Sequence, residues 1–169
     1  MDINKFIEEA RKNAEQCGAG LINKKSSLSG AESCTGGLVS KILTDTAGAS
    51  KYFQGAVVTY SNEAKTHFIG VKNETLETVG AVSGECAAQM AAGAKREFCT
   101  GYGFSTTGIA GPEGGTEEKP VGTVYFGIAE PDGNVLTYHK TFAGDRNEIR
   151  IQAADFILKE LKNILNHGK

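Results

Sequence analysis

Short segments rich in β-branched and aromatic residues alternate with segments of helical periodicity along most of this 169-residue chain. Strands are expected at residues 27–32, 55–61, 104–109, 121–129 and 135–142. Helices are expected at residues 3–16, 36–44, 62–70, 83–98 and 145–165, and the CGAG stretch at residues 17–20 is expected to be a turn after the first helix. This alternation is typical of layered α/β folds, in which helices cover a sheet on both faces. A chain of this length fits one domain of ordinary size.

The turn sequence EPDGN lies between the last two strands and predicts an antiparallel hairpin. Because the earlier strands are separated by helices, the sheet is expected to be mixed. The helix at 83–98 has Ser83 as its N-cap, and the closing helix has Asp145 with Glu148 three residues later, as in a capping box. The sequence therefore predicts a single-domain α/β/α sandwich with a mixed sheet over residues 1–169.

Composition and charge exclude several classes of protein. The formal net charge is -2 and no basic run is present, so nucleic acid is not an expected partner. The apolar runs are too short to cross a membrane, and the mixed charges of the N-terminus do not form a secretory signal. We therefore expect a cytoplasmic protein. Four cysteines and three histidines lack metal-ligand spacing, so no metal site is predicted.

Three segments share one pattern, in which a strand ends, small polar residues follow and a turn begins. These segments are AESCTGG at 31–37, VVTYSNEAK at 57–65 and STTGIAGPEGG at 105–115. The carboxyl ends of strands in open α/β sheets form the crevice where ligands bind. We therefore expect the three segments to line one site.

The first segment offers two neighbouring nucleophiles, Ser33 and Cys34. Thr35 is expected to cap the next helix, while Gly36 and Gly37 let the backbone approach a ligand and expose N–H groups to an oxyanion or a phosphate. The alternative is structural: Ser33 and Thr35 serve only as caps, and the glycines only fit a tight corner.

The second segment places Tyr60 at a strand end and Lys65 about one turn into the following helix. A lysine whose ammonium is desolvated can act as a base toward a serine. The alternative is that Lys65 is a solvated helix residue.

The third segment continues into a glycine-rich loop, but this loop lacks the order of a P-loop because Pro120 follows Lys119. Its length and polarity make it a candidate lid over a substrate. Arg146 and Arg150 are four residues apart on the closing helix and are candidates for binding a phosphate; the alternative is a solvated rim.

Taken together, the blocks AESCTGG, GAVVTYSNEAK, GAVS, TGIAGPEGGTEEKPVG and GDRNEIR resemble the CinA family, specifically its C-terminal amidohydrolase domain, over about residues 5–165. The resemblance is to a stand-alone form, without the N-terminal domain of longer members that is similar to molybdopterin-binding proteins. It implies hydrolysis of the carboxamide of nicotinamide mononucleotide to nicotinic acid mononucleotide and ammonia, in pyridine-nucleotide salvage. No metal or organic cofactor is implied, and the family pattern suggests a homo-oligomer.

The resemblance also implies roles for individual residues. Ser33 is the nucleophile, and Lys65 takes its proton either directly or through Tyr60. The residues expected to hold the oxyanion through backbone N–H groups are Thr35, Gly36 and Gly37. The residues expected to face the nucleotide are Thr107, Gly108, Gly111 and Arg146, the last from this or a neighbouring subunit. Cys34 is expected to point into the helix packing.

Two other functions stay open at this point. One is a nucleotide-sensing module that keeps the pocket without turnover, and the other is an amidase for another small amide. The joint presence of Ser33, Tyr60 and Lys65 argues against the first, because a module without turnover is free to lose one of them.

Overall fold

A five-stranded mixed sheet forms the centre of the computed structural model, which describes residues 3–167. The strands are β1 (Leu28–Glu32), β2 (Phe53–Val58), β3 (Tyr102–Gly108), β4 (Thr123–Ala129) and β5 (Val135–Thr141), in the spatial order β2-β1-β3-β4-β5. Strand β1 runs parallel to both β2 and β3, whereas β4 runs antiparallel to both β3 and β5. The predicted mixed sheet and closing hairpin are confirmed.

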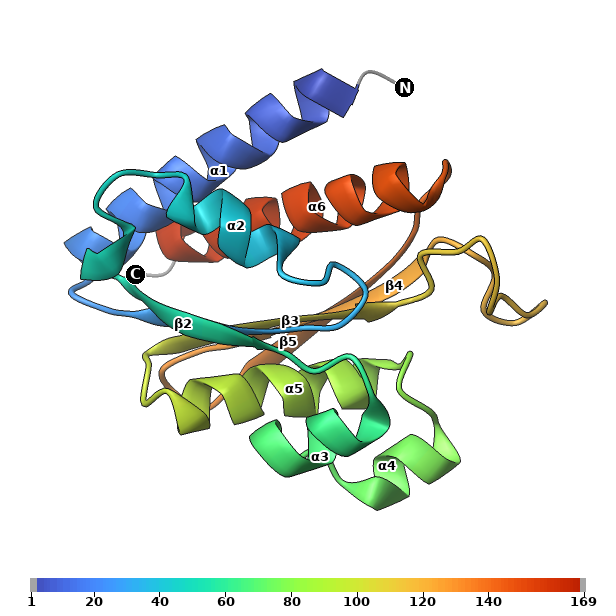
Figure 1. The fold of residues 1–169 in the computed structure, drawn as a ribbon. Helices are drawn as coiled ribbons and strands as arrows, with labels where there is room; N and C mark the ends of the chain where they lie inside the picture. The colour runs from blue at the N-terminus through green and yellow to red at the C-terminus, as the bar shows by residue number, and fades with distance from the viewer. Residues whose placement is uncertain (1–2, 168–169) are drawn as a thin grey trace.

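Helices cover the sheet on both faces (Figure 1). One face is covered by α1 (Ile3–Asn23), α2 (Leu38–Thr44) and α6 (Arg146–His167). The other is covered by α3 (Asn62–Ile69), α4 (Asn73–Thr78) and α5 (Gly84–Glu97), and a short 3₁₀ turn, η1 (Ala49–Lys51), precedes β2. The α/β/α sandwich expected from the sequence is therefore confirmed. No helix within residues 3–167 is long and apolar enough to span a membrane.

The apolar core is unequal on the two faces of the sheet. The larger cluster lies under α1, α2 and α6 and includes Leu21, Phe126 and Ile157, all buried. The smaller cluster lies under α3 and α5 around Ile69 and Met90. Burial of this apolar surface is the main favourable term in folding, so the α1–α6 side supplies most of it.

The predicted helix ends are mostly confirmed. The Ser83 hydroxyl accepts a hydrogen bond from the N–H of Cys86, and Gly70 ends α3 with φ 68°. Asp145 accepts from the N–H groups of Asn147 and Glu148, while the Glu148 carboxylate accepts from the N–H of Asp145. This reciprocal pair is the predicted capping box.

The first helix is longer than predicted, because it continues through CGAG to Asn23. The two glycines in this stretch were interpreted as a turn, but they lie inside the helix at close contacts. A Cβ at Gly18 would lie 2.6 Å from the Tyr52 ring, and one at Gly20 would lie 3.0 Å from Leu165 Cβ. These glycines therefore serve packing, which periodicity alone does not reveal. Helix α4 was also not predicted.

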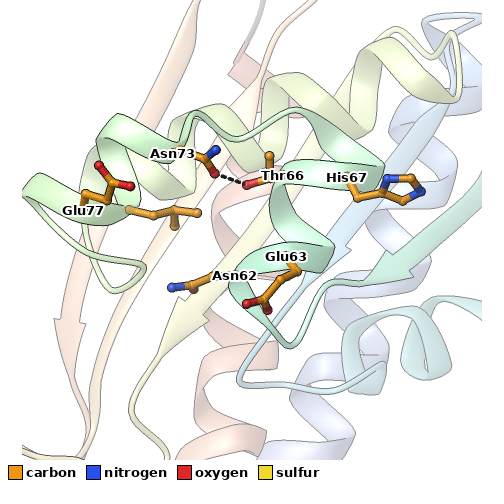
Figure 2. Close-up of a pocket in the computed structure, with 7 residues that line it drawn as sticks. Asn62, Glu63, Thr66, His67, Asn73 and Glu77 are labelled. Carbon is orange, nitrogen blue, oxygen red and sulfur yellow. Dashed lines mark hydrogen bonds between the residues drawn. The ribbon is translucent and has the colours of Figure 1, made fainter.

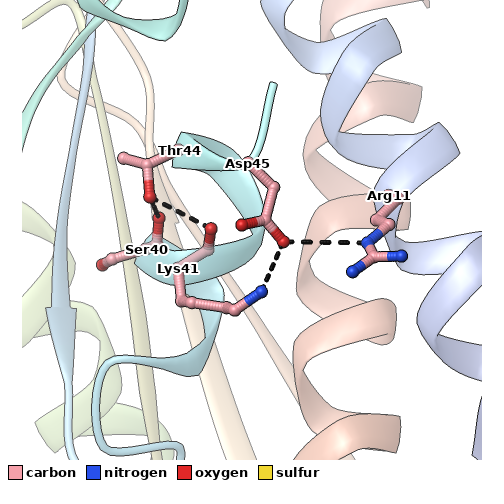
Figure 3. Close-up of polar contacts among 5 residues, drawn as sticks. All are labelled: Arg11, Ser40, Lys41, Thr44 and Asp45. Atoms are coloured by element: carbon pink, nitrogen blue, oxygen red, sulfur yellow. Dashed lines mark hydrogen bonds and ion pairs between the residues drawn. The ribbon is translucent and has the colours of Figure 1, made fainter. Parts of the chain in front are cut away.

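Exposed polar contacts join the end of α2 to α1 (Figure 3). Asp45 lies 2.6 Å from Lys41 Nζ and 3.7 Å from Arg11 Nε, and the hydrogen bond from Lys41 lowers the pKa of its carboxyl group. The Thr44 hydroxyl donates to the carbonyls of Ser40 and Lys41. Solvent-exposed ion pairs add little stability, so we assign this group a minor role.

Candidate active site

A cavity of about 300 Å³ opens at the carboxyl ends of β1 and β3, beside the corner that joins β2 to α3. Seven of the ten predicted site residues line it: Ser33, Tyr60, Lys65, Thr107, Gly108, Gly111 and Arg146. Residues that the sequence did not single out also line it, among them Asn62, Ala81, Val82 and Glu113. Because parallel strands end at the same edge of a sheet, the fold brings the three predicted segments to one place.

Ser33 and Lys65 are in direct contact within this cavity. Ser33 directly follows β1 and is 8% exposed, while Lys65 lies on the first turn of α3 and is 1% exposed. The Lys65 Nζ atom lies 3.1 Å from Ser33 Oγ, 2.8 Å from the Thr59 carbonyl and 3.4 Å from the Tyr60 carbonyl. The interpretation of Lys65 as a solvated helix residue is therefore wrong.

Burial changes the titration of Lys65. Desolvation lowers the pKa of its ammonium below the ordinary value of 10.5, against a smaller opposite effect from the Cys86 and Cys34 thiols. None of its three hydrogen-bond partners is a carboxylate. A buried lysine without a counter-ion favours its neutral form, which is the form that can accept a proton.

Tyr60 lines the cavity, and its hydroxyl is hydrogen-bonded to Arg146. The residue is 61% exposed, and its hydroxyl accepts this hydrogen bond at 2.8 Å. Lys65 contacts only the backbone carbonyl of Tyr60. This arrangement favours direct contact of Lys65 with Ser33 over a relay through the tyrosine.

Arg146 spans the cavity mouth from the first turn of α6. Besides the Tyr60 hydroxyl, its guanidinium donates to the Gly111 carbonyl at 2.7 Å, so the Arg146 of the same chain reaches this cavity. Arg150 does not line the cavity; it donates to the Thr35 carbonyl at 2.8 Å. The two arginines therefore have separate places, although they share one helix face.

Cys34 packs into the larger apolar cluster, as predicted, and it also lines the cavity next to Ser33. Burial raises the pKa of its thiol to about 12. Only the thiolate is a strong nucleophile, so a thiol with this pKa is poorly suited to attack near neutral pH. Of the two candidate nucleophiles, Ser33 is the one that contacts a possible base, Lys65.

The turn between β1 and α2 differs from the prediction. Thr35 does not cap α2: its hydroxyl donates to Glu32 Oε2 at 2.6 Å, and Gly37 is the N-cap. The N–H of Gly36 donates to the Ser33 carbonyl, and the N–H of Gly37 donates to Glu32 Oε2. These two donors are engaged within the turn, whereas the Thr35 N–H has no acceptor among the described residues.

Glu32 is the main residue that sequence reasoning missed. It is fully buried at the end of β1, and its carboxylate accepts hydrogen bonds from the start of α2. A signal was present, because an acid at the end of a buried strand of small and apolar residues requires donors, and glycines and hydroxyl residues follow it.

The glycine-rich loop between β3 and β4 projects beyond the sheet (Figure 1). Thr107, at the end of β3, donates its hydroxyl to the Ala81 carbonyl at 2.7 Å. The loop itself is mostly exposed from Pro112 to Glu118, and the Lys119 ammonium donates to the Val79 carbonyl. Its start, Gly108 to Gly111, forms one wall of the cavity.

A second hollow of about 440 Å³ lies on α3 and α4 (Figure 2). Its lining includes Glu63, His67 and Glu77, and Thr66 donates to Asn73 across it. Asn62 lines both this hollow and the Ser33 cavity. The larger hollow lacks Ser33, Lys65 and Arg146, so size alone does not identify the candidate active site.

A serine paired with a buried lysine, at the carboxyl edge of an α/β sheet, has the geometry of a Ser–Lys hydrolase site. Comparison with known proteins identifies the family. The model of the CinA C-terminal domain matches residues 10–165, and the chain belongs to this family.

Curated relatives and solved structures extend the comparison. The chain is 48% identical over 148 residues to the nicotinamide-nucleotide amidohydrolase PncC of Escherichia coli K12, covering 88% of this chain and 90% of that protein. It is 50% identical over 138 residues to a CinA-like protein of Leptospira biflexa, of which it covers 33%. The crystal structure of the competence/damage inducible protein CihA from Agrobacterium tumefaciens superposes with a TM-score of 0.90 at 39% identity, covering 94% of this chain and 96% of that one.

Proposed function

We propose that this protein hydrolyses the carboxamide of nicotinamide mononucleotide to nicotinic acid mononucleotide and ammonia, through an acyl-enzyme on Ser33, in pyridine-nucleotide salvage. The observation that carries the proposal is the 3.1 Å contact between Lys65 Nζ and Ser33 Oγ inside a cavity. The choice of substrate is supported by the 48% identity to relatives named nicotinamide-nucleotide amidohydrolase. As a member of this family, the chain is a hydrolase that acts on an amide.

Lys65 is the general base of the acylation step. A neutral amine has two N–H donors and one lone pair, and Lys65 has two carbonyl acceptors and one hydroxyl within reach. The two N–H groups donate to the carbonyls of Thr59 and Tyr60, so the lone pair faces Ser33. Ser33 Oγ then attacks the amide carbon while its proton moves to Lys65 Nζ.

The tetrahedral intermediate places a negative charge on the former carboxamide oxygen. Of the three residues predicted to hold it, Thr35 has an N–H without another acceptor among the described residues, so Thr35 is our candidate donor. One such donor is typically worth about 3 kcal/mol of transition-state stabilisation. Gly36 and Gly37 give the turn its shape, with φ values of 59° and 93° that favour glycine.

Collapse of the intermediate breaks the C–N bond, and Lys65 returns its proton to the departing ammonia. The pyridinium ring withdraws electrons from the carboxamide, which eases both attack and departure. Water then attacks the acyl carbon with Lys65 again as base, and the Ser33 oxygen leaves with the proton. The acyl group leaves as the carboxylic acid, which loses its proton to water to become the carboxylate, and Ser33 is regenerated; none of these steps requires a metal or an organic cofactor.

Arg146 binds the phosphate of the substrate in this proposal. Its guanidinium already lies at the cavity mouth, and planar donors of this kind pair well with phosphate oxygens. Thr107, Gly108 and Gly111 line the wall between the nucleophile and Arg146. The nucleotide therefore extends from Ser33 toward α6.

The test is ammonia release from nicotinamide mononucleotide by the purified protein, with and without a chelator. We expect release that a chelator does not change, that Ser33→Ala abolishes and that Cys34→Ala retains. Loss in Cys34→Ala as complete as in Ser33→Ala would overturn the assignment of Ser33.

Two further arms test the alternatives. If the mononucleotide binds to the wild type but no ammonia forms, the protein is a nucleotide-sensing module. If the riboside, which lacks the phosphate, is hydrolysed as well as the mononucleotide, the role of Arg146 is wrong and the substrate is a simpler amide.

A further inference from the structure

We propose that Glu32 is a positioning residue for the reaction: its buried carboxylate fixes the turn that presents Ser33 to Lys65. Glu32 is the last residue of β1, directly before the nucleophile, and is 0% exposed. The inference rests on the proposed function, because it assigns a role within that reaction.

The carboxylate is satisfied by the turn and by the start of α2. Oε2 accepts from the Thr35 hydroxyl at 2.6 Å and from the N–H groups of Gly37 and Val39 at 2.9 and 3.2 Å. Oε1 accepts from the N–H of Ser40 at 2.8 Å and from the Ser40 hydroxyl at 2.5 Å. All five donors are uncharged and lie within residues 35–40. One side chain on the sheet therefore holds both the turn and the first residues of the following helix.

The hydrogen-bond directions around Thr35 follow from this arrangement. Because the single Thr35 hydroxyl proton goes to Glu32, the Thr106 hydroxyl at 2.7 Å must donate to Thr35. The Thr35 carbonyl accepts from Arg150. The side chain and the carbonyl of Thr35 are thus both fixed, and this buried residue holds the turn in one conformation.

Ser33 is fixed on its other side by the sheet. Its N–H donates to the Thr106 carbonyl of β3 at 2.9 Å, and its carbonyl accepts from the N–H of Gly36 at 3.1 Å. The backbone of the nucleophile is thus held between β3 and the turn that Glu32 organises. A shift of about 1 Å in a reacting group can cost about 100-fold in rate, so this fixation has kinetic consequences.

The same contacts separate this inference from a rival arrangement. If the oxyanion were held by the N–H groups of Gly37 and Val39, the Glu32 carboxylate would compete with it for those donors. Neutralising Glu32 would then leave the rate unchanged or raise it. Under our assignment the same change lowers the rate, so the sign of the effect decides between the two.

The first variant is Glu32→Gln, which keeps the size of the side chain. Whichever way the amide is oriented, its NH₂ faces at least one backbone N–H that the carboxylate accepted. We expect kcat for nicotinamide mononucleotide to fall about 100-fold. We expect KM to stay within a few-fold, because Arg146 and the cavity wall are unchanged. The matched control is Ile42→Val on the buried face of α2, which should lower stability but keep kcat.

A second pair of variants serves if Glu32→Gln does not fold. Thr35→Val removes the hydroxyl that joins Glu32 to Thr106 at nearly constant volume, whereas Thr35→Ser retains the hydroxyl. We expect about a 10-fold lower kcat for Thr35→Val, the loss typical of a hydrogen bond to a charged group, and recovery in Thr35→Ser. A purely structural role would lower the melting temperature and the active fraction, without a kcat difference per active site.

The rate at which a fluorophosphonate labels Ser33 provides a readout that does not depend on the substrate. We expect slower labelling in Glu32→Gln and Thr35→Val than in the wild type and in Ile42→Val. Unchanged kcat and unchanged labelling in the folded variants would overturn the positioning role alone. A wild type that labels at Ser33 but releases no ammonia would overturn the proposed function, while the labelling rates would still decide the role of Glu32.

Discussion

The turn at residues 33–37 and the glycine-rich loop at residues 109–122 line the same cavity but are built in opposite ways. In the turn, Ser33, Cys34 and Thr35 are buried, and contacts from Glu32, Thr106 and Arg150 fix the backbone. In the loop, residues 112–118 are exposed, and the Lys119 ammonium and the Gly111 carbonyl provide contacts to the rest of the chain.

This difference matches the demands of the proposed reaction. The reacting atoms must keep their distance within a fraction of an ångström, so the nucleophile is held by buried hydrogen bonds. A nucleotide must enter and leave, so the wall that faces it is an exposed loop. The predictions below test this division, from the reacting pair outward to the tip of the loop.

The largest effect is expected for Lys65→Met. Loss of the general base should lower kcat about 100- to 10,000-fold. The variant should also be more stable near neutral pH. Because burial lowers the pKa of Lys65, the unfolded chain binds this proton more readily than the native protein, and the native state is penalised below the ordinary pKa. Each kcal/mol of penalty removed should raise the melting temperature by about 2–4 °C.

Thermal unfolding and ammonia release measure both parts of this prediction. Lys41→Met, at an exposed position of α2, is the control. It should change neither the melting temperature nor the rate of ammonia release strongly. A lower melting temperature in Lys65→Met would contradict the neutral, desolvated lysine.

The pH dependence of the rate is the next largest effect. Since the base must be neutral, kcat/KM should rise about tenfold per pH unit below the Lys65 pKa and then level off. The midpoint should lie below 10.5, the ordinary value for lysine. Because the Cys34 thiol has a pKa of about 12, Cys34→Ala should keep the rise with pH, with only a small downward shift of the midpoint from the lost effect of Cys34 on Lys65. Loss of the rise in Cys34→Ala would point to the thiol.

Arg146→Ala tests the side of the cavity that faces the nucleotide. We expect KM for nicotinamide mononucleotide to rise about 10- to 100-fold, the value of a hydrogen bond between charged groups, with kcat changed much less. The small activity toward the riboside should not change, because that substrate has no phosphate. Arg11→Ala, on α1 outside the cavity, is the matched control. A fall in kcat with unchanged KM would place Arg146 with the reacting groups instead.

The smallest effect is expected at the tip of the loop. Lys119→Ala removes the contact with the Val79 carbonyl, and stability should change by less than about 0.5 kcal/mol. A glutamate-specific protease should cut faster at Glu117 and Glu118, and nicotinamide mononucleotide should slow the cutting if the loop closes over it. Cleavage at the wild-type rate would show that Lys119 does not restrain the loop.

Much of the fold was predictable because its signals are local. The capping box at Asp145 and Glu148, the EPDGN hairpin and the serine cap at Ser83 depend on neighbours within a few residues. The predictions that failed involve distant partners. Gly18 and Gly20 were taken for a turn because their neighbours, Tyr52 and Leu165, lie far away in the sequence.

The candidate site shows the same division. Its membership was predictable, because each segment ends a strand with small polar residues, and parallel strands end at the same edge of a sheet. The roles of the individual residues within the site were less predictable. Thr35 was expected to cap α2, yet its hydroxyl donates to Glu32. The Glu32 carboxylate is the group that accepts the N–H hydrogen bonds at the start of the helix.

By itself, the amino-acid sequence determined the layered α/β architecture, the family and seven of the residues at the cavity, since periodicity and motifs are written in contiguous segments. Only the tertiary structure decided which of these groups touch. It buried Lys65 against Ser33, turned the Tyr60 hydroxyl toward Arg146 and closed Cys34 into the core. The physical reason is that desolvation and hydrogen-bond partners depend on neighbours in space, and residues 33 and 65 become neighbours only when the sheet forms.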